Sequence, residues 1–126
     1  NVVRAGFPHL SEDGSVVLVS GVPARKCNPG MSAISCVGNA VEGLGRALAL
    51  ELAPKRVNVV APGIIDTAMF DRMGDGKAAA FAQMSQNIPL KRVGQANEVA
   101  NAILFLMTTP FVTGTTIDVD GGQLLP

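Results

Sequence analysis

The chain has 126 residues, enough for one domain, and 48% of them are hydrophobic. This composition supports a packed core and argues against intrinsic disorder. Ten basic residues balance ten acidic ones, so the charge predicts no nucleic-acid partner and no attachment to an anionic membrane. No apolar run reaches the ~20 residues that a membrane span needs, and the first residues do not resemble a signal peptide.

Two cysteines, Cys27 and Cys36, lie nine residues apart, with no CxxC motif and no histidine nearby. This pattern favours reduced thiols in a cytoplasmic protein over a metal or redox role. We therefore expect a cytoplasmic location and no metal site.

The first predicted strand is the apolar run Val16–Val19, which lies between Gly14 and Gly21. An apolar run without alternation is typical of a strand that is covered on both faces, as in a parallel sheet. Similar runs at Val57–Ala61 and Thr115–Val119 each end at glycine-containing turns. The chain therefore predicts about three parallel strands.

A long helix is predicted between the first two strands, from Ser32 to Leu52, with Ser32 as its N-cap and Pro54 beyond its end. Apolar residues recur at steps of three and four on one face: Ile34, Val37, Val41, Leu44 and Leu48. Small residues recur every seven positions on another face, where they would allow close packing: Ala33, Ala40 and Ala47.

A second helix is predicted over Glu98–Met107, capped by Asn97 and apolar on nearly every face, which favours deep burial. Alternating strands and helices indicate an α/β fold with a parallel sheet. Between the second strand and this helix, Asp66–Asn87 contains two glycines and three methionines. It is either a mobile helical insertion over a site or an ordinary pair of surface helices.

Four motifs in chain order resemble those of the short-chain dehydrogenase/reductase family, and together they span essentially the whole chain. They are Gly43-Leu44 with Arg46–Leu52, Asn58–Gly63 with Ile65 and Thr67, Arg92–Gly94 with Glu98–Ala100, and Phe111–Gly114 with Asp118–Gly122. The resemblance implies a doubly wound, Rossmann-type parallel sheet, which binds ligands at its strand ends.

The resemblance also implies a cofactor, NAD or NADP, for the protein as a whole. The segment Pro62-Gly63 would close over the nicotinamide ring, the backbone of Ile65 would bond its carboxamide, and the Thr67 hydroxyl would bond the cofactor. Pro62 fixes φ, and Gly63 permits a close backbone approach. The alternative is that Pro62-Gly63 only makes the turn that ends the strand.

The glycine-rich phosphate loop of the family has no counterpart here, because no G-x-x-x-G-x-G occurs. We therefore expect residues 1–126 to be the C-terminal part of a longer Rossmann-type domain that lacks the phosphate-binding half. Such a part alone could not hold a dinucleotide's pyrophosphate at a helix N-terminus. Its first strand would also keep an unpaired edge.

By resemblance, the family's catalytic Ser, Tyr and Lys correspond to Gly21, Ile34 and Gly38. These residues have no titratable group, and the chain contains no tyrosine at all. The usual general acid–base chemistry therefore has no obvious carrier, and we assign no catalytic residue.

Several other residues were considered for a role at the site. Ser20 is a candidate for the missing serine, whereas Arg25 and Lys26 either bind an anion or form solvated surface. His9 is expected far from the crevice, near a helix C-terminus. Asp66 and Asp71 fit a helix N-terminal charge better than a substrate contact.

Two functions remain open. The first is an NAD(P)-dependent oxidoreductase by descent, with weak or atypical catalysis on a small carbonyl or alcohol. The second is an inactive relative that serves as a structural subunit or nucleotide-binding module. The resemblance further implies a homodimer or homotetramer formed through helix 32–52 and through helix 98–107 with strand 115–119.

Overall fold

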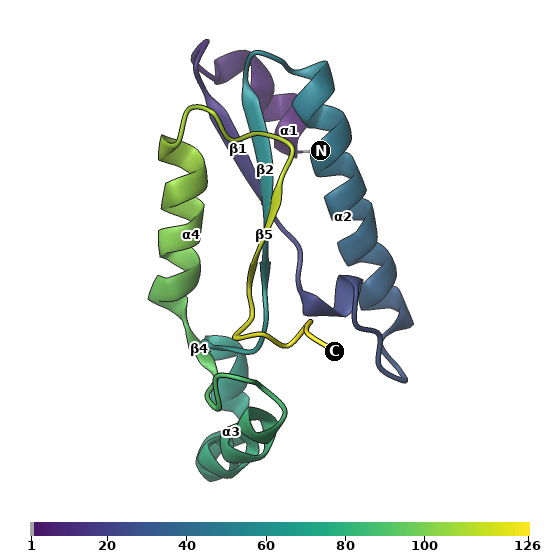
Figure 1. The fold of residues 1–126 in the computed structure, drawn as a ribbon, viewed down its shortest axis with the longest axis vertical. Helices are drawn as coiled ribbons and strands as arrows, with labels where there is room; N and C mark the ends of the chain where they lie inside the picture. The colour runs from purple at the N-terminus through teal and green to yellow at the C-terminus, as the bar shows by residue number, and fades with distance from the viewer. Residues whose placement is uncertain (1) are drawn as a thin grey trace.

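A computed structural model describes residues 2–126 and shows a three-stranded parallel sheet in the order β1-β2-β5 (Figure 1). The strands are β1 (Ser15–Val19), β2 (Arg56–Pro62) and β5 (Thr116–Val119). In the register, Val17 lies opposite Asn58 and Val60 lies opposite Ile117. The predicted α/β fold with about three parallel strands is confirmed.

Helices cover both faces of this sheet, with α2 (Ser32–Glu51) on one side and α4 (Ala96–Thr108) on the other (Figure 1). The chain opens with α1 (Val2–Gly6) and η1 (Phe7–His9), and η2 (Val22–Ala24) follows β1. Both long helices match the predicted ranges to within two residues.

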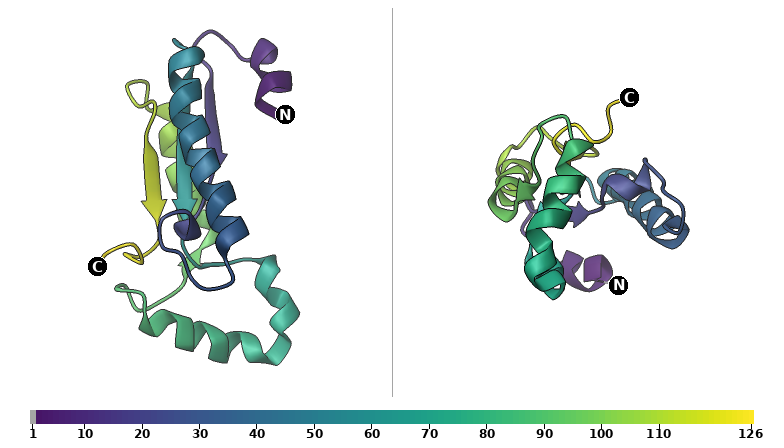
Figure 2. Two further views of the ribbon diagram at one scale, coloured as in Figure 1. Left: turned by 90° about the vertical axis from the view of Figure 1, so that its right-hand side faces the viewer. Right: turned by 90° about the horizontal axis from the view of Figure 1, so that it is seen from below.

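The segment after β2 lies beyond the carboxyl ends of the strands (Figure 2). It contains β3 (Ile65–Asp66), η3 (Ala68–Gly76), α3 (Lys77–Gln86) and β4 (Gly94–Gln95). β3 and β4 form a separate parallel pair, which the sequence analysis did not predict because each is only two residues long. The helical character predicted for 66–87 is confirmed.

The core centres on β2, whose residues from Val57 to Ala61 are at most 1% exposed. Asn58 is also fully buried, and its amide donates to the Val112 carbonyl oxygen at 2.9 Å, while its oxygen accepts from the Thr115 N–H at 3.2 Å. Both polar ends of this side chain are therefore satisfied. The asparagine that interrupts the apolar run ties β2 to the turn before β5.

β1 pairs only with β2 among the described residues and so forms an edge, as expected. Its last residue, Val19, is 57% exposed. The strand that was predicted to be covered on both faces is therefore less covered at its end than its apolar sequence indicated.

The face of α2 that packs on the sheet is formed by small and polar residues. The buried residues of this helix are Ser35, Glu42, Gly45 and Ala49. Gly45 lies so close to β2 that an added Cβ would be 2.5 Å from Val59 Cγ2. Small side chains at 45 and 49 permit this approach, whereas Ala40 and Ala47 of the predicted small face are exposed.

The apolar face predicted from helical spacing is only partly covered. Ile34, Val37 and Leu44 are 56%, 63% and 42% exposed. The periodicity identified the helix correctly, but it could not distinguish a face that packs within the subunit from one that does not.

Deep burial of α4 was also predicted and is wrong, because only Leu106 is buried. Leu104, Phe105 and Met107 are each about half exposed. α4 covers only one face of a narrow sheet, so most of its circumference is left uncovered by residues 2–126.

The predicted helix caps are wrong by one or two positions. Met31 rather than Ser32 precedes α2, without a side-chain cap. α4 begins with a capping box formed by Gln95 and Glu98 instead of a cap at Asn97. The capping box satisfies two N-terminal N–H groups reciprocally, which a single asparagine cannot do.

Candidate functional site

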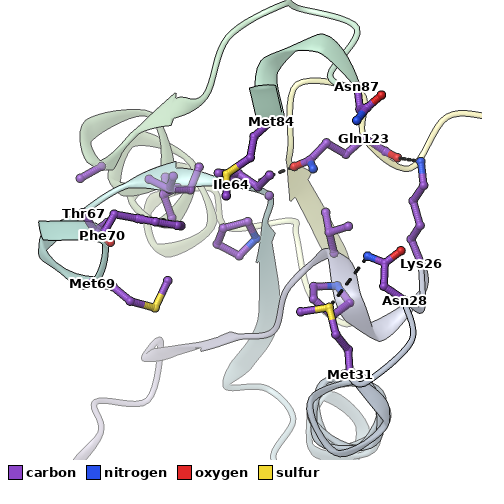
Figure 3. Close-up of a pocket in the computed structure, with 17 residues that line it drawn as sticks. Lys26, Asn28, Met31, Ile64, Thr67, Met69, Phe70, Met84, Asn87 and Gln123 are labelled. Carbon is purple, nitrogen blue, oxygen red and sulfur yellow. Dashed lines mark hydrogen bonds between the residues drawn. The ribbon is translucent and has the colours of Figure 1, made fainter. Parts of the chain in front are cut away.

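The largest cavity, of about 990 Å³, lies at the carboxyl ends of β1 and β2 and is called here the strand-end cavity. Its walls come from the loop after β1, the segment that follows β2, and the C-terminal Gln123 (Figure 3). Its larger apolar side chains are Met31, Met69, Phe70, Met84 and Val99. Parallel sheets bind ligands at this edge, so the cavity lies where the fold places a site.

A second cavity, of about 510 Å³, lies between the end of β1 and the first turns of α2 and is called here the α2 cavity. It contains Gly21, Ile34 and Gly38, the three positions that the resemblance assigns to the family's Ser, Tyr and Lys. No residue that lines it, in the part of the chain described, has a titratable side chain. Proton transfer inside this cavity therefore has no side-chain acid or base that titrates near neutral pH.

The two cavities meet at Pro62 and Gly63, which line both. Gly63 is required here by packing, because an added Cβ would lie 2.8 Å from the Asp120 Cα atom. The side-chain oxygen of Gln123 fills the space beside it and accepts from the Ile64 N–H at 2.9 Å. The C-terminal segment therefore holds the turn that follows β2.

Ile65 extends this turn along the strand-end cavity. The Gly94 N–H donates to the Ile64 carbonyl oxygen at 2.9 Å, and Gly94 lies opposite Ile65 in the β3–β4 pair. Because a parallel ladder uses alternate residues of each strand, the Ile65 N–H and carbonyl point away from β4. This backbone pair fits the two-sided hydrogen bonding that a carboxamide offers.

Thr67 lines the same cavity and is exposed. It precedes η3, and its side chain accepts no capping hydrogen bond from the helix, so its hydroxyl is available to a ligand. Pro62, Gly63, Ile65 and Thr67, the four residues predicted to bind the cofactor, are thus brought together along one wall. Their geometry fits a nicotinamide, and binding itself stays a prediction.

The three catalytic positions differ in the space around them. At Gly21 an added Cβ would make ordinary contacts of 3.5 Å, and Ile34 is 56% exposed. At Gly38, however, an added Cβ would lie 2.8 Å from the Ala24 Cβ. The loop after β1 therefore occupies the space that a side chain at position 38 would need.

A polar network behind the α2 cavity was missed by the sequence analysis. The Ser20 hydroxyl lies 3.1 Å from the Glu42 carboxylate and 3.2 Å from the Gly38 carbonyl oxygen, both acceptors. Ser20 is therefore oriented toward α2, which argues against its use as the missing serine. The one sequence signal was Glu42 itself, a carboxylate among the small and apolar residues of the helix.

Arg25 completes this network. Its guanidinium pairs with Glu42 at 3.3 Å and forms a bidentate ion pair with Asp118 of β5. Asp118 beside it raises the pKa of the Arg25 guanidinium above its ordinary value. Glu42 is only 6% exposed, so the arginine supplies the counter-charge that a buried carboxylate needs. With both carboxylates bound, Arg25 is not an anion site, whereas Lys26 lines the strand-end cavity.

The remaining candidates take structural positions. His9 is exposed at the end of η1 and lines neither cavity. Lys77 pairs with Asp66 at 2.7 Å and with Asp71 at 2.9 Å, and the hydrogen bonds that its ammonium donates to these two carboxylates raise its pKa. The two aspartates therefore hold the start of α3 beside β3.

Cys27 and Cys36 are free thiols, as expected. Residues 2–126 contain no group of three or more His, Cys, Asp or Glu side chains that could hold a metal ion. In the same range, no helix has both the length and the apolar character to cross a membrane.

A parallel sheet covered by helices on both faces, with a cavity at its strand ends, is typical of a Rossmann-type fold. Residues 1–123 match the family model described as enoyl-(acyl carrier protein) reductase, and the chain belongs to this branch of the short-chain dehydrogenases/reductases. The rat 3-oxoacyl-[acyl-carrier-protein] reductase is 41% identical over 118 residues, which are 92% of this chain and 48% of that protein. The chain therefore spans about half the length of the curated relatives it matches.

Two solved structures that resemble the chain contain NADPH. A small-chain dehydrogenase in complex with NADPH is 36% identical, with a TM-score of 0.93, and the match covers 98% of this chain and 57% of the other. An NADPH-bound short chain oxidoreductase from Pseudomonas aeruginosa PAO1, described as containing an atypical catalytic center, is 37% identical, with a TM-score of 0.87. That match covers 95% of this chain and 50% of the other.

Proposed function

We propose that the protein is an NADP-dependent oxidoreductase with an atypical catalytic centre, acting on a small carbonyl or alcohol. The observation that carries this proposal is the wall that Pro62, Gly63, Ile65 and Thr67 form along the strand-end cavity. Two NADPH-bound relatives support NADP over NAD.

In this proposal the strand-end wall binds the nicotinamide end of the cofactor. The Ile65 N–H and carbonyl pair with the carboxamide, and the Thr67 hydroxyl adds one hydrogen bond. Bound NADPH would supply the hydride, while the protein supplies position and electrostatics. Residues 1–126 are proposed to form the C-terminal part of a longer domain, whose other half binds the phosphates.

The absence of a tyrosine makes the proposed catalysis atypical. No side chain of the α2 cavity can give or take a proton near neutral pH. Loss of a general acid alone lowers a rate by about 10²–10⁴. We therefore expect slow turnover, with the proton supplied from outside this cavity.

The second candidate function is a catalytically inactive nucleotide-binding or structural subunit. The packing of Ala24 against Gly38 favours it, because the loop fills the place of a functional side chain rather than leaving it open.

Free, exposed cysteines are compatible with the proposed cytoplasmic location.

Titration of NADPH and NADH fluorescence against the protein that includes the preceding half-domain tests the proposal. Micromolar binding of NADPH, with weaker binding of NADH, is the expected result. A Thr67→Val variant should bind NADPH several-fold more weakly, since one hydrogen bond is lost. Absence of nucleotide binding would leave only the structural role.

Binding without turnover across a panel of carbonyls and alcohols would favour the inactive nucleotide-binding subunit. Turnover that depends on NADPH, even when slow, would establish the oxidoreductase. The two candidate functions are therefore separated by one binding and one activity measurement on the same preparation.

A further inference from the structure

We propose that Lys26 forms an anion subsite in the strand-end cavity, and that the natural substrate is an amphipathic carboxylate with an apolar body. This inference rests on the proposed function for the identity of the cavity as a substrate site. It adds the chemical class of the ligand and the residue that selects it.

The lining of the cavity defines the first part of this class. Methionine, phenylalanine and valine side chains supply most of its large walls, and Lys26 is the one titratable residue among those that line it in the part of the chain described. Hydrogen-bonding side chains are also present: Asn28, Thr67, Asn87 and Gln123. A mostly apolar pocket with a single cation favours a ligand that has an apolar body and one negative charge.

The charge of Lys26 is not neutralised within the described chain. Its Nζ atom donates to the Gln123 backbone carbonyl at 2.6 Å, and no carboxylate lies within 4.0 Å of it among residues 2–126. The adjacent Arg25, in contrast, is paired with both Glu42 and Asp118. An ammonium has three donors, so two of those on Lys26 remain for a ligand.

Gln123 places this charge next to the reacting end of the cavity. Its backbone oxygen binds Lys26, while its side-chain oxygen binds the Ile64 N–H of the turn after β2 (Figure 3). One residue thus joins the cation to the wall proposed to bind the nicotinamide. A carboxylate held by Lys26 would have its apolar body directed over Met31 and toward Met69 and Met84, which line the same space.

The test compares octanoate with octanamide, two probes that differ in charge but have the same chain. Their binding to the protein that includes the preceding half-domain is measured by chemical-shift titration, without nucleotide. Wild type is expected to prefer octanoate about tenfold, the value of one charge-assisted hydrogen bond. Lys26→Met should abolish this preference, and Lys26→Arg should retain most of it.

Lys91→Met is the matched control, because Lys91 also donates to a single backbone carbonyl, that of Gln86 at 2.9 Å, and lies outside the cavity. It should leave the preference unchanged. Equal binding of the two probes by wild type, no binding of either, or an unchanged preference in Lys26→Met would each overturn the subsite. Because no nucleotide is present, these outcomes are independent of NADPH binding, which tests the proposed function.

Discussion

At the scale of single residues, Gly38 is the position that the resemblance assigns to the family's lysine and that packing restricts. The resemblance alone describes Gly38 as the loss of a lysine, a substitution that mutation could reverse. In the structure, a Cβ added at this position would lie 2.8 Å from the Ala24 Cβ. Restoring the lysine therefore requires a different path for the loop after β1, in addition to the new side chain.

The first prediction concerns the packing at this position. Gly38→Ala should destabilise the protein by about 1–3 kcal/mol, because the new methyl group overpacks against Ala24. Gly43→Ala on the same helix is the control, since nothing lies within 4 Å of its added Cβ. It should stabilise by about 0.5–1 kcal/mol through helix propensity. Urea unfolding monitored by circular dichroism measures both, and equal effects of the two variants would contradict the packing argument.

Among the elements, the N-terminus of α4 offers a test by pH. Glu98 accepts from Arg92 and from the Gln95 N–H, and these hydrogen bonds lower the pKa of its carboxyl to about 2 from an ordinary 4.5. A carboxyl whose pKa is lower in the folded state than in the unfolded state stabilises the fold fully when the pH is above its unfolded-state pKa. This stabilisation is lost as the pH falls through the folded-state pKa. The contribution of Glu98 should therefore disappear between about pH 4.5 and pH 2.

The measurement compares unfolding midpoints of wild type and Glu98→Gln from about pH 6 to about pH 2. Wild type should be more stable at the upper end, and the two curves should converge at the lower end. Glu51→Gln, an exposed change at the end of α2, serves as control and should run parallel to wild type. A constant difference between wild type and Glu98→Gln over the whole range would show that the carboxylate charge is not responsible.

Element type and order could be predicted from the chain because they depend on local patterns. The apolar run at 57–61 indicated a buried strand, and the spacing within 32–52 indicated a helix. Which helix face packs inward could not be predicted, because Gly45 and Ala49 carry almost no hydrophobic signal, although their small size is what admits β2. Burial of α4 failed for a related reason, since periodicity does not reveal how wide the sheet is.

The parts of the candidate site that are close together in the sequence could be predicted. The contacts between segments far apart in the sequence could not. Pro62, Gly63, Ile65 and Thr67 are nearly consecutive, so one motif located all four. The contact of Arg25 with Asp118 spans 93 positions, and that of Lys26 with Gln123 spans 97. No local pattern reports such pairs, which depend on β1 and β5 lying on either side of β2.

For the whole molecule, the notable feature is that α2 and α4 expose apolar side chains that no other part of residues 2–126 covers. Ile34, Val37 and Leu44 on α2, together with Leu104, Phe105 and Met107 on α4, are between 42% and 63% exposed. Large exposed apolar side chains that gather on one face of a helix mark interaction sites. We propose that these helices, with β5, bind a second copy of the chain, so that the residues which failed to pack on the sheet pack between subunits.

Leu44→Glu tests this association, because it places a charge in the centre of the exposed α2 face. Leu50→Glu is its control: Leu50 is 83% exposed on the same helix but lies about 120° around its axis. Sedimentation velocity should show wild type and Leu50→Glu as oligomers and Leu44→Glu shifted toward the monomer, since a buried unpaired charge is costly. A monomeric wild type would contradict the proposal outright, whereas equal dissociation by both variants would move the interface away from this face. Because Leu44 lines neither cavity, nucleotide binding by the dissociated variant would further show whether the site is complete within one subunit.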